Sequence, residues 1–258
     1  MDWKAFLNTD GEQPLDRFVQ GISNTAIFRT IGFIGDSLSS GEFESRSAEG
    51  TAGYHDYFEY SWGQYIARKN GLTAYNFSRG GMSAKWYMQN YAEENGFWDP
   101  EKVCQAYVIA LGVNDVIGGR QTVGSVEDIC LEDYTQNAPT FAGYYAMIIQ
   151  RLKQIQPQAK FFLVTMPRTG DDRDDDRRAV AQLLHSFAAY FDNTYVIDLF
   201  RYAPVYDAAF KEKFFLYGHM NASGYIFTAN MIDAYIDYLV RHNPEDFRRV
   251  PYIGKGLQ

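Results

Sequence analysis

Five short apolar runs, separated by longer stretches of helical periodicity, most strongly limit what this chain can fold into. Each run is followed directly by turn-forming or polar residues. Runs that are apolar throughout are typical of strands buried on both faces, as in a parallel sheet covered by helices. The sequence therefore predicts an α/β fold with a five-stranded parallel sheet. The predicted strands cover residues 30–35, 73–77, 106–111, 160–166 and 194–199.

The stretches between the strands predict the main helices. The last of these places Tyr225, Ile232 and Leu239 on one broad apolar face, at the spacing of an amphipathic helix. We expect Asn221 to cap this helix, because asparagine side chains accept hydrogen bonds from the first N–H groups of a helix. The predicted helices cover residues 61–69, 140–154, 174–190 and 222–240.

A chain of 258 residues, 46% of them hydrophobic, can build one sizeable core and is marginal for two independent domains. We predict a single domain over residues 1–258, with a core at about 30–240. Residues 1–28 and 243–258 fall outside the strand and helix pattern and form terminal extensions. We expect these extensions to pack onto a neighbouring subunit or over the rim of a ligand site, which leaves a homo-oligomer open.

Charge and composition argue against several classes of partner. The formal net charge of -8 and the lack of a basic patch argue against nucleic acid and anionic membranes. No apolar run approaches the roughly 20 residues of a membrane helix, and the first residues do not resemble a signal peptide. We therefore expect a cytoplasmic protein, or a secreted one if a signal peptide has been removed. Cys104 and Cys130 lack metal-type spacing, so we predict free thiols, no metal and no cofactor.

Polar residues follow three of the predicted strands and precede the last helix. Parallel sheets bind ligands beyond the carboxyl ends of their strands, so these segments are expected to meet at one edge of the sheet. They contain Ser37 after the first strand, Gly80 and Gly81 after the second, Asn114 after the third, and His219 before the last helix.

These residues supply the parts that a nucleophilic serine needs. Ser37 would attack a carbonyl carbon, and His219 would accept the serine proton and pass it to the leaving alcohol. The backbone N–H groups of Ser37 and Gly81 and the side-chain amide of Asn114 would form the oxyanion hole. Glycine lets its N–H approach a bound carbonyl closely, and asparagine donates without adding charge. Gly80 is the alternative glycine donor.

The four segments resemble the sequence blocks of the SGNH, or GDSL, hydrolase family, and they occur in the same order. The resemblance spans about residues 30–240 and implies a flavodoxin-like αβα sandwich with strand order 2-1-3-4-5. The spacing of the second block favours Gly81 over Gly80. The first three matching segments are Gly-Asp-Ser-Leu at residues 35–38, Asn76 followed five residues later by Gly81, and Gly-Val-Asn-Asp at residues 112–115.

The fourth block departs from the family pattern, in which an aspartate usually stands three residues before the histidine. Here that position is Leu216. The acid fixes the imidazole tautomer and stabilises the imidazolium, so its loss calls for a replacement. The leading interpretation is a Ser37–His219 dyad in which a backbone carbonyl binds the imidazole N–H. Asp198, at the end of a strand, and Asp207, in the loop leading towards the histidine, are alternative acids.

Other polar residues near these segments have structural interpretations. Asp36 and Asp115 are expected to brace their loops rather than react. His185 and His242 have no motif around them, and we treat them as structural. His55 lies in the long insertion after the nucleophile, a segment that could form a lid or a pocket wall.

The pattern predicts a metal-independent serine esterase that cleaves carboxylic esters through an acyl-serine intermediate. The resemblance implies relatives that include carbohydrate acetylesterases, arylesterases, lysophospholipases and thioesterases, and fold alone does not choose among them. Aromatic residues make up 17% of the chain and can line a sugar-binding surface, so an acetylated carbohydrate is the predicted substrate. Two alternatives stay open: a non-catalytic member that binds carbohydrate or protein, and an acyltransferase.

Overall fold

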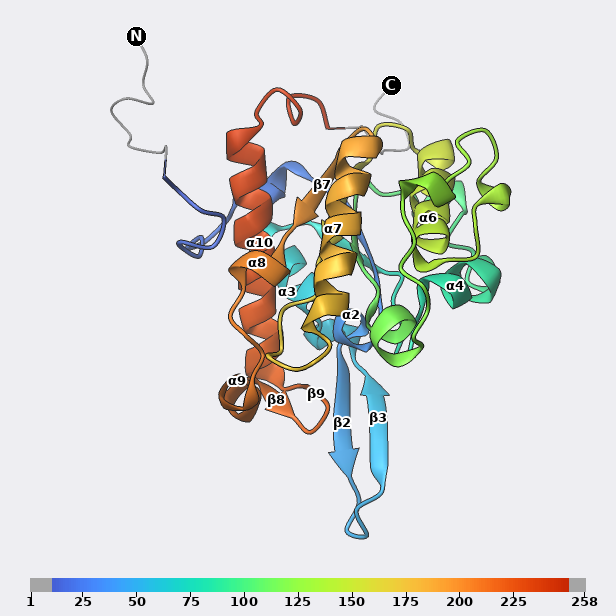
Figure 1. Ribbon diagram of the computed structural model, residues 1–258. Coiled ribbons are helices and arrows are strands. Elements are labelled where there is room, and N and C mark those ends of the chain that lie inside the picture. Colours follow the sequence, from blue (N-terminus) through green and yellow to red (C-terminus); the bar gives the residue numbers. More distant parts are fainter. Residues whose placement is uncertain (1–10, 251–258) are drawn as a thin grey trace.

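In the computed structural model, which describes residues 11–250, a five-stranded parallel sheet forms the centre of the molecule (Figure 1). Each strand pairs in parallel with its neighbours, in the order β4-β1-β5-β6-β7. Numbered along the chain, these five strands have the order 2-1-3-4-5. The predicted α/β class, parallel sheet and strand order are therefore confirmed. The strands are β1 (Thr30–Gly35), β4 (Thr73–Asn76), β5 (Ala106–Ala110), β6 (Lys160–Val164) and β7 (Thr194–Ile197).

Helices cover both faces of the sheet and make it the middle of three layers (Figure 1). On β6, Phe161 belongs to the core under one pair of helices, whereas Phe162 belongs to the core under the other pair. Successive side chains of a strand point to opposite faces, so strands covered on both faces must be apolar throughout. The covering helices are α3 (Trp62–Asn70) and α10 (Ala222–His242) on one face and α6 (Phe141–Ile155) and α7 (Asp174–Tyr190) on the other.

The bounds of these four helices agree with the predicted bounds to within two residues, because local signals fix the helix ends. Ser61 and Thr140 accept backbone N–H groups at the starts of α3 and α6. Asn221 accepts the N–H of Gly224 at 2.9 Å, which confirms it as the cap of α10. Gly71 ends α3 with a φ of 67°, in the left-handed region that glycine adopts without strain.

The remaining helical segments are short and lie in the connections between strands and helices. They position loops rather than cover the sheet. They are η1 (Asn24–Ile27), α2 (Ser37–Ser40), η2 (Phe58–Tyr60), α4 (Ala84–Trp86), η3 (Tyr87–Tyr91), α5 (Ala92–Glu94), η4 (Pro100–Lys102), η5 (Val113–Gly118), η6 (Val126–Asp128), η7 (Tyr134–Gln136), α8 (Leu199–Tyr202) and α9 (Ala208–Phe214).

Within residues 11–250, two antiparallel hairpins lie outside the central sheet. The larger one, β2 (Glu42–Arg46) with β3 (Ala52–Asp56), projects from the body of the molecule next to α2 (Figure 1). The smaller one is β8 (Phe215–Leu216) with β9 (His219–Met220). Neither hairpin was predicted. Charged residues alternate along β2, so it lacks the apolar run that marks the strands of the central sheet.

The described parts of both terminal extensions pack against their own chain. Ser23 Oγ donates to Asp233 Oδ1 on α10 at 2.6 Å. The Asn24 N–H donates to Asp237 Oδ1 on the same helix at 2.9 Å. Phe247 stacks on Phe162 of the sheet, with ring centroids 6.2 Å apart. These parts therefore contact their own chain, and packing on a neighbouring subunit stays a prediction. Residues 1–10 and 251–258 lie outside the described residues.

Two further expectations can be compared with residues 11–250. Cys104 and Cys130 are both free cysteines, as predicted, and Cys104 is buried. Burial raises the pKa of the Cys104 thiol strongly, so this side chain behaves as a small apolar group. Over the same residues, no helix combines the length and the hydropathy needed to cross a membrane.

Candidate active site

Ser37 is the first residue of α2 and stands at the carboxyl end of β1. Asp36 is the N-cap of this helix and accepts a helix N–H at 3.1 Å. Burial raises the pKa of Asp36 to about 6. Gly35 is needed here, because a Cβ at this position would lie 2.5 Å from Ser39 Cβ. The expected bracing role of Asp36 is confirmed, and Ser37 is left half-buried at the sheet edge.

Hydrogen bonds join the loops that follow β1, β4 and β5, as expected for three loops at one edge of the sheet. The Asp115 carboxylate accepts the backbone N–H of Ala84, which confirms that Asp115 braces its loop. Burial raises the pKa of this carboxyl group to about 7. The bonds run from Ser78 Oγ to Ser39 Oγ (2.8 Å), from Asn114 Nδ2 to Met82 O (3.0 Å) and from the Ala84 N–H to Asp115 Oδ1 (2.8 Å).

Three N–H donors are available at this edge. Within residues 11–250, the backbone N–H groups of Ser37 and Gly81 have no hydrogen-bond acceptor. Asn114 donates one of its two amide hydrogens to a loop carbonyl and keeps the other. Gly81 has a φ of 72° and open space where a side chain would stand. A Cβ on Gly80 would instead lie 2.0 Å from Glu42 Oε2, so the open position is that of Gly81.

His219 lies on β9, which contacts α2, and its ring is held between two carboxylates. Nδ1 is 3.3 Å from Glu44 Oε2, and Nε2 is 2.9 Å from Glu42 Oε1. Tyr54 packs edge-on against the ring, with centroids 5.6 Å apart. In the described part of the chain, Ser37 Oγ has no hydrogen-bond partner. Ser37 and His219 therefore share one edge, but Nε2 faces Glu42 rather than the serine.

Glu42 and Glu44 alternate on β2, so both side chains lie on the face that meets His219. They are 8% and 4% exposed, which is unusual for glutamate. Glu44 Oε2 also accepts the Gly218 N–H at 2.9 Å, and Glu44 Oε1 pairs with Arg46 at 2.5 Å. Neither glutamate was predicted as a site residue. The sequence shows two acids, two residues apart, directly after the segment that contains Ser37. It does not show which residue would pair with them.

The two acids considered from the sequence lie elsewhere. Asp207 is the N-cap of α9 and accepts the Phe210 N–H at 2.9 Å. Asp198 is the N-cap of α8, and its Oδ2 lies 2.8 Å from His185 Nε2. Among residues 11–250, neither carboxylate has a hydrogen bond to His219. Nor is a backbone carbonyl bonded to the His219 ring in this region, because both ring nitrogens face glutamates.

The other histidines have partners of their own. His185 binds Asp198, and His242 Nδ1 lies 2.8 Å from Tyr238 O. His55 Nε2 lies 2.9 Å from Ser45 Oγ, across the β2–β3 hairpin. In the part of the chain that is described, no three His, Cys, Asp or Glu side chains are arranged to hold a metal ion.

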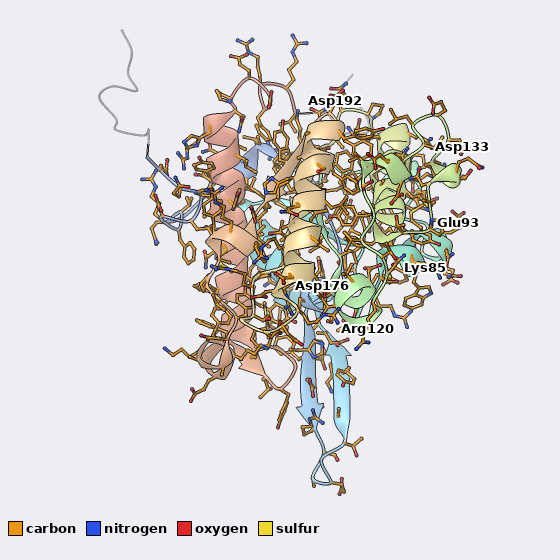
Figure 2. The ribbon with its side chains drawn as sticks, viewed as in Figure 1. Lys85, Glu93, Arg120, Asp133, Asp176 and Asp192 are labelled. Atoms are coloured by element: carbon orange, nitrogen blue, oxygen red, sulfur yellow. The ribbon has the colours of Figure 1, made fainter. Side chains whose placement is uncertain are left out.

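A cavity of about 270 Å³ lies beside the serine segment, between the sheet edge and α10. Leu38 flanks it on the side of Ser37, and Gly218 flanks it on the side of His219. Its walls are mainly apolar and include Met166 and Ile232. Figure 2 shows Asp176 at the same end of the molecule as the base of the β2–β3 hairpin, while Asp192 marks the opposite end of α7.

The αβα sandwich and the four polar segments at its carboxyl edge are those of an acylhydrolase. The chain belongs to the GDSL-like Lipase/Acylhydrolase family, whose model matches residues 33–226. The family resemblance inferred from the sequence is therefore confirmed. No curated protein matches the sequence.

Solved structures with a similar fold include carbohydrate esterases. A family 2 carbohydrate esterase from Myceliophthora fergusii is 16% identical, with a TM-score of 0.58 over 87% of this chain and 68% of that one. A family two carbohydrate esterase from Clostridium thermocellum, solved with cellohexaose, is 16% identical, with a TM-score of 0.53 over 88% and 67%. A protein from Lactobacillus plantarum is 17% identical, with a TM-score of 0.56 over 82% and 97%. At these identities the likeness shows a shared fold.

Proposed function

We propose that this chain is a serine esterase that hydrolyses carboxylic esters through an acyl-Ser37 intermediate. The proposal is carried by one observation, the convergence of Ser37, free N–H donors and His219 at the carboxyl edge of the sheet. A serine hydroxyl, oxyanion donors and an imidazole are the parts that acyl transfer requires. Membership of an acylhydrolase family supports the same class of reaction.

The first half-reaction forms the acyl-enzyme. The Ser37 oxygen bonds to the carbonyl carbon while its proton passes to His219 Nε2. The carbonyl oxygen becomes negatively charged and accepts hydrogen bonds from the N–H groups of Ser37 and Gly81 and from the Asn114 amide. The bond to the alcohol then breaks as the alcohol oxygen takes the proton from Nε2. Water repeats these steps on the acyl group, which releases the acid and restores the serine.

We propose an acylated carbohydrate as the substrate. Tyr54 and Tyr217 are 57% and 56% exposed on the two hairpins beside His219, and amphipathic aromatic rings suit the faces of sugars. Carbohydrate esterases among the structures of similar fold support this choice. The apolar cavity beside Leu38 supports an acyl group longer than acetyl, because two carbons would fill only a small part of it.

Hydrolysis of p-nitrophenyl acetate, butyrate and octanoate by the wild type and by Ser37→Ala tests the esterase proposal. We expect turnover by the wild type and a loss of at least about 10³-fold in the variant. Ser186→Ala is a matched control, because Ser186 is exposed on α7 and bonds only to a helix carbonyl. Equal rates for the wild type and Ser37→Ala at every chain length would disprove the esterase.

Acyl esters of a methyl glycoside, compared with ethyl esters of the same acids in a pH-stat, test the substrate. We expect a higher kcat/KM for the sugar esters, because the exposed tyrosine rings would stack on a sugar but not on an ethyl group. Replacing both Tyr54 and Tyr217 by alanine should remove this preference. Tyr54 also packs against His219, so the rates for the ethyl esters measure the effect of the replacements on the imidazole itself. A preference that persists in the double variant, or is absent in the wild type, contradicts the carbohydrate assignment.

A further inference from the structure

The two carboxylates that hold the His219 ring differ in their surroundings, and Glu44 is the one built to stay charged. Its Oε2 accepts the Gly218 N–H, and its Oε1 pairs with the guanidinium of Arg46. The Gly218 N–H lowers the pKa of Glu44, with further help from His219 and Arg46. A carboxylate with these partners acts as a fixed hydrogen-bond acceptor for Nδ1.

Glu42 lies in a setting that favours its protonated form. Its carboxylate is packed against Gly80, and Asp56 stands opposite it in the register of the β2–β3 hairpin. Burial raises the pKa of Glu42, and the Asp56 and Glu44 carboxylates add to this effect, while His219 opposes it. Glu42 is therefore the carboxyl group that takes up a proton more readily.

The two contacts have different consequences for the imidazole. A neutral imidazole carries one N–H, and a bond to the Glu44 carboxylate requires that hydrogen on Nδ1. Nε2 is then the basic nitrogen, which is the tautomer that Ser37 needs. Nε2, however, lies 2.9 Å from Glu42 Oε1, at ion-pair distance. Within the described residues it makes no hydrogen bond to Ser37, so in this arrangement the serine proton does not pass to the imidazole.

We propose that Glu44 is the residue that orients His219, in place of the acid missing at Leu216, and that Glu42 competes with Ser37 for Nε2. In the productive arrangement, Nε2 leaves Glu42 and faces Ser37 while the Nδ1–H stays on Glu44. Both glutamates are positioning residues, because they act through the imidazole and not on the ester. The effect on rate rests on the proposed esterase function, whereas the orientation of the ring does not.

Several charged and titratable groups lie around the ring, on both strands of the β2–β3 hairpin and before α2. The groups are Glu42, Glu44 and Arg46 on β2, Tyr54, His55 and Asp56 on β3, and Asp36 before α2.

Rate profiles against pH separate the two roles. We expect Glu44→Gln to lower kcat on the order of 10²–10⁴-fold with little change in KM, because the tautomer is no longer fixed. We expect Glu42→Gln to keep or raise kcat at the plateau of the profile, because no carboxylate then competes with Ser37 for Nε2. Glu49→Gln is the matched control, because it makes the same substitution at the exposed tip of the hairpin. Equal losses in the Glu42 and Glu44 variants would overturn the division of roles.

Nitrogen-15 NMR of the histidine rings gives a readout that does not depend on turnover. The His219 signals are identified by their disappearance in His219→Gln. At a pH where the ring is neutral, we expect the Nδ1–H tautomer in the wild type, Glu42→Gln and Glu49→Gln, and its loss in Glu44→Gln. The thermal unfolding midpoint of each variant shows whether it is folded. An unchanged tautomer in folded Glu44→Gln overturns the proposal even if no ester is hydrolysed, and inactivity of the wild type alone counts only against the esterase.

Discussion

An acid placed at position 216 should partly compensate for the loss of Glu44. Leu216 on β8 pairs directly with His219 on β9. Directly opposed residues of an antiparallel pair point to the same face, with Cβ atoms roughly 4.5–5.5 Å apart. Leu216 is 46% exposed, so an aspartate there needs no rearrangement of the core and keeps its charge in contact with water. The double variant Glu44→Gln, Leu216→Asp therefore brings a carboxylate within reach of Nδ1.

The expected recovery is modest because the position is half exposed. Opposite unit charges about 4 Å apart attract by about 1 kcal/mol in water and about 4 kcal/mol at the dielectric of a protein surface. Because Leu216 is 46% exposed, we expect the attraction between the introduced carboxylate and the imidazolium to be about 1–2 kcal/mol, nearer the value in water. If this energy stabilises the imidazolium in the transition state, kcat rises about 5- to 30-fold over Glu44→Gln alone. Recovery stays incomplete, because the introduced carboxylate lacks the Gly218 and Arg46 contacts of Glu44.

The assay compares kcat for p-nitrophenyl acetate at a pH above the acid limb of each variant. Leu216→Asn in the same Glu44→Gln background is the matched control, because it has the same shape without the charge. We expect it to recover less than about threefold, since a neutral amide does not stabilise an imidazolium by charge. Recovery by asparagine equal to that by aspartate, or no recovery by aspartate, would refute the argument that His219 lacks only an oriented anion.

Three further predictions concern the oxyanion hole, the buried acid Asp115 and the cavity. Asn114→Ala should lower kcat on the order of 10²–10³-fold with little change in KM, and a loss below about tenfold contradicts its role as an oxyanion donor. Burial raises the pKa of Asp115 to about 7, so its contribution to the free energy of unfolding is present at low pH and is lost as the pH rises through about 7. Urea titrations between about pH 4 and 8 should therefore show a flatter dependence for Asp115→Asn, and an unchanged slope contradicts this. Met166→Trp should narrow the cavity and lower octanoate hydrolysis at least about tenfold relative to acetate, whereas equal losses mean that the cavity does not hold the acyl chain.

Much of the fold could be predicted because its signals are local. Each strand of the central sheet is apolar over its whole length, since both of its faces are covered, and single residues such as Asn221 mark helix ends. Ser37 and Asn114 could be identified as candidate site residues because each lies in the segment that follows a strand. The carboxyl edge of a parallel sheet then brings such loops together without further information.

The β2–β3 hairpin and its glutamates could not be predicted in the same way. Burying a carboxylate is unfavourable unless it is paired. When the sequence shows no partner for acids at every second position, as at Glu42 and Glu44, it indicates a strand exposed to solvent. The partner of Glu44 is His219, 175 residues further along the chain. Only the folded chain places them 3.3 Å apart.

The positions of the candidate acids show why closeness in sequence is a weak guide to this site. Asp198 and Asp207 precede His219 by a short stretch of chain, yet both cap helices and accept backbone N–H groups there. Their carboxylates already accept backbone N–H groups at the starts of these helices, where the N–H groups would otherwise be unpaired. Glu44 comes instead from the insertion after Ser37, and that insertion reaches His219 because both segments leave the same edge of the sheet. With Glu44 in this role, the acid that orients the imidazole comes from the loop after the first block, so an SGNH sequence without aspartate in its fourth block can carry the acid there.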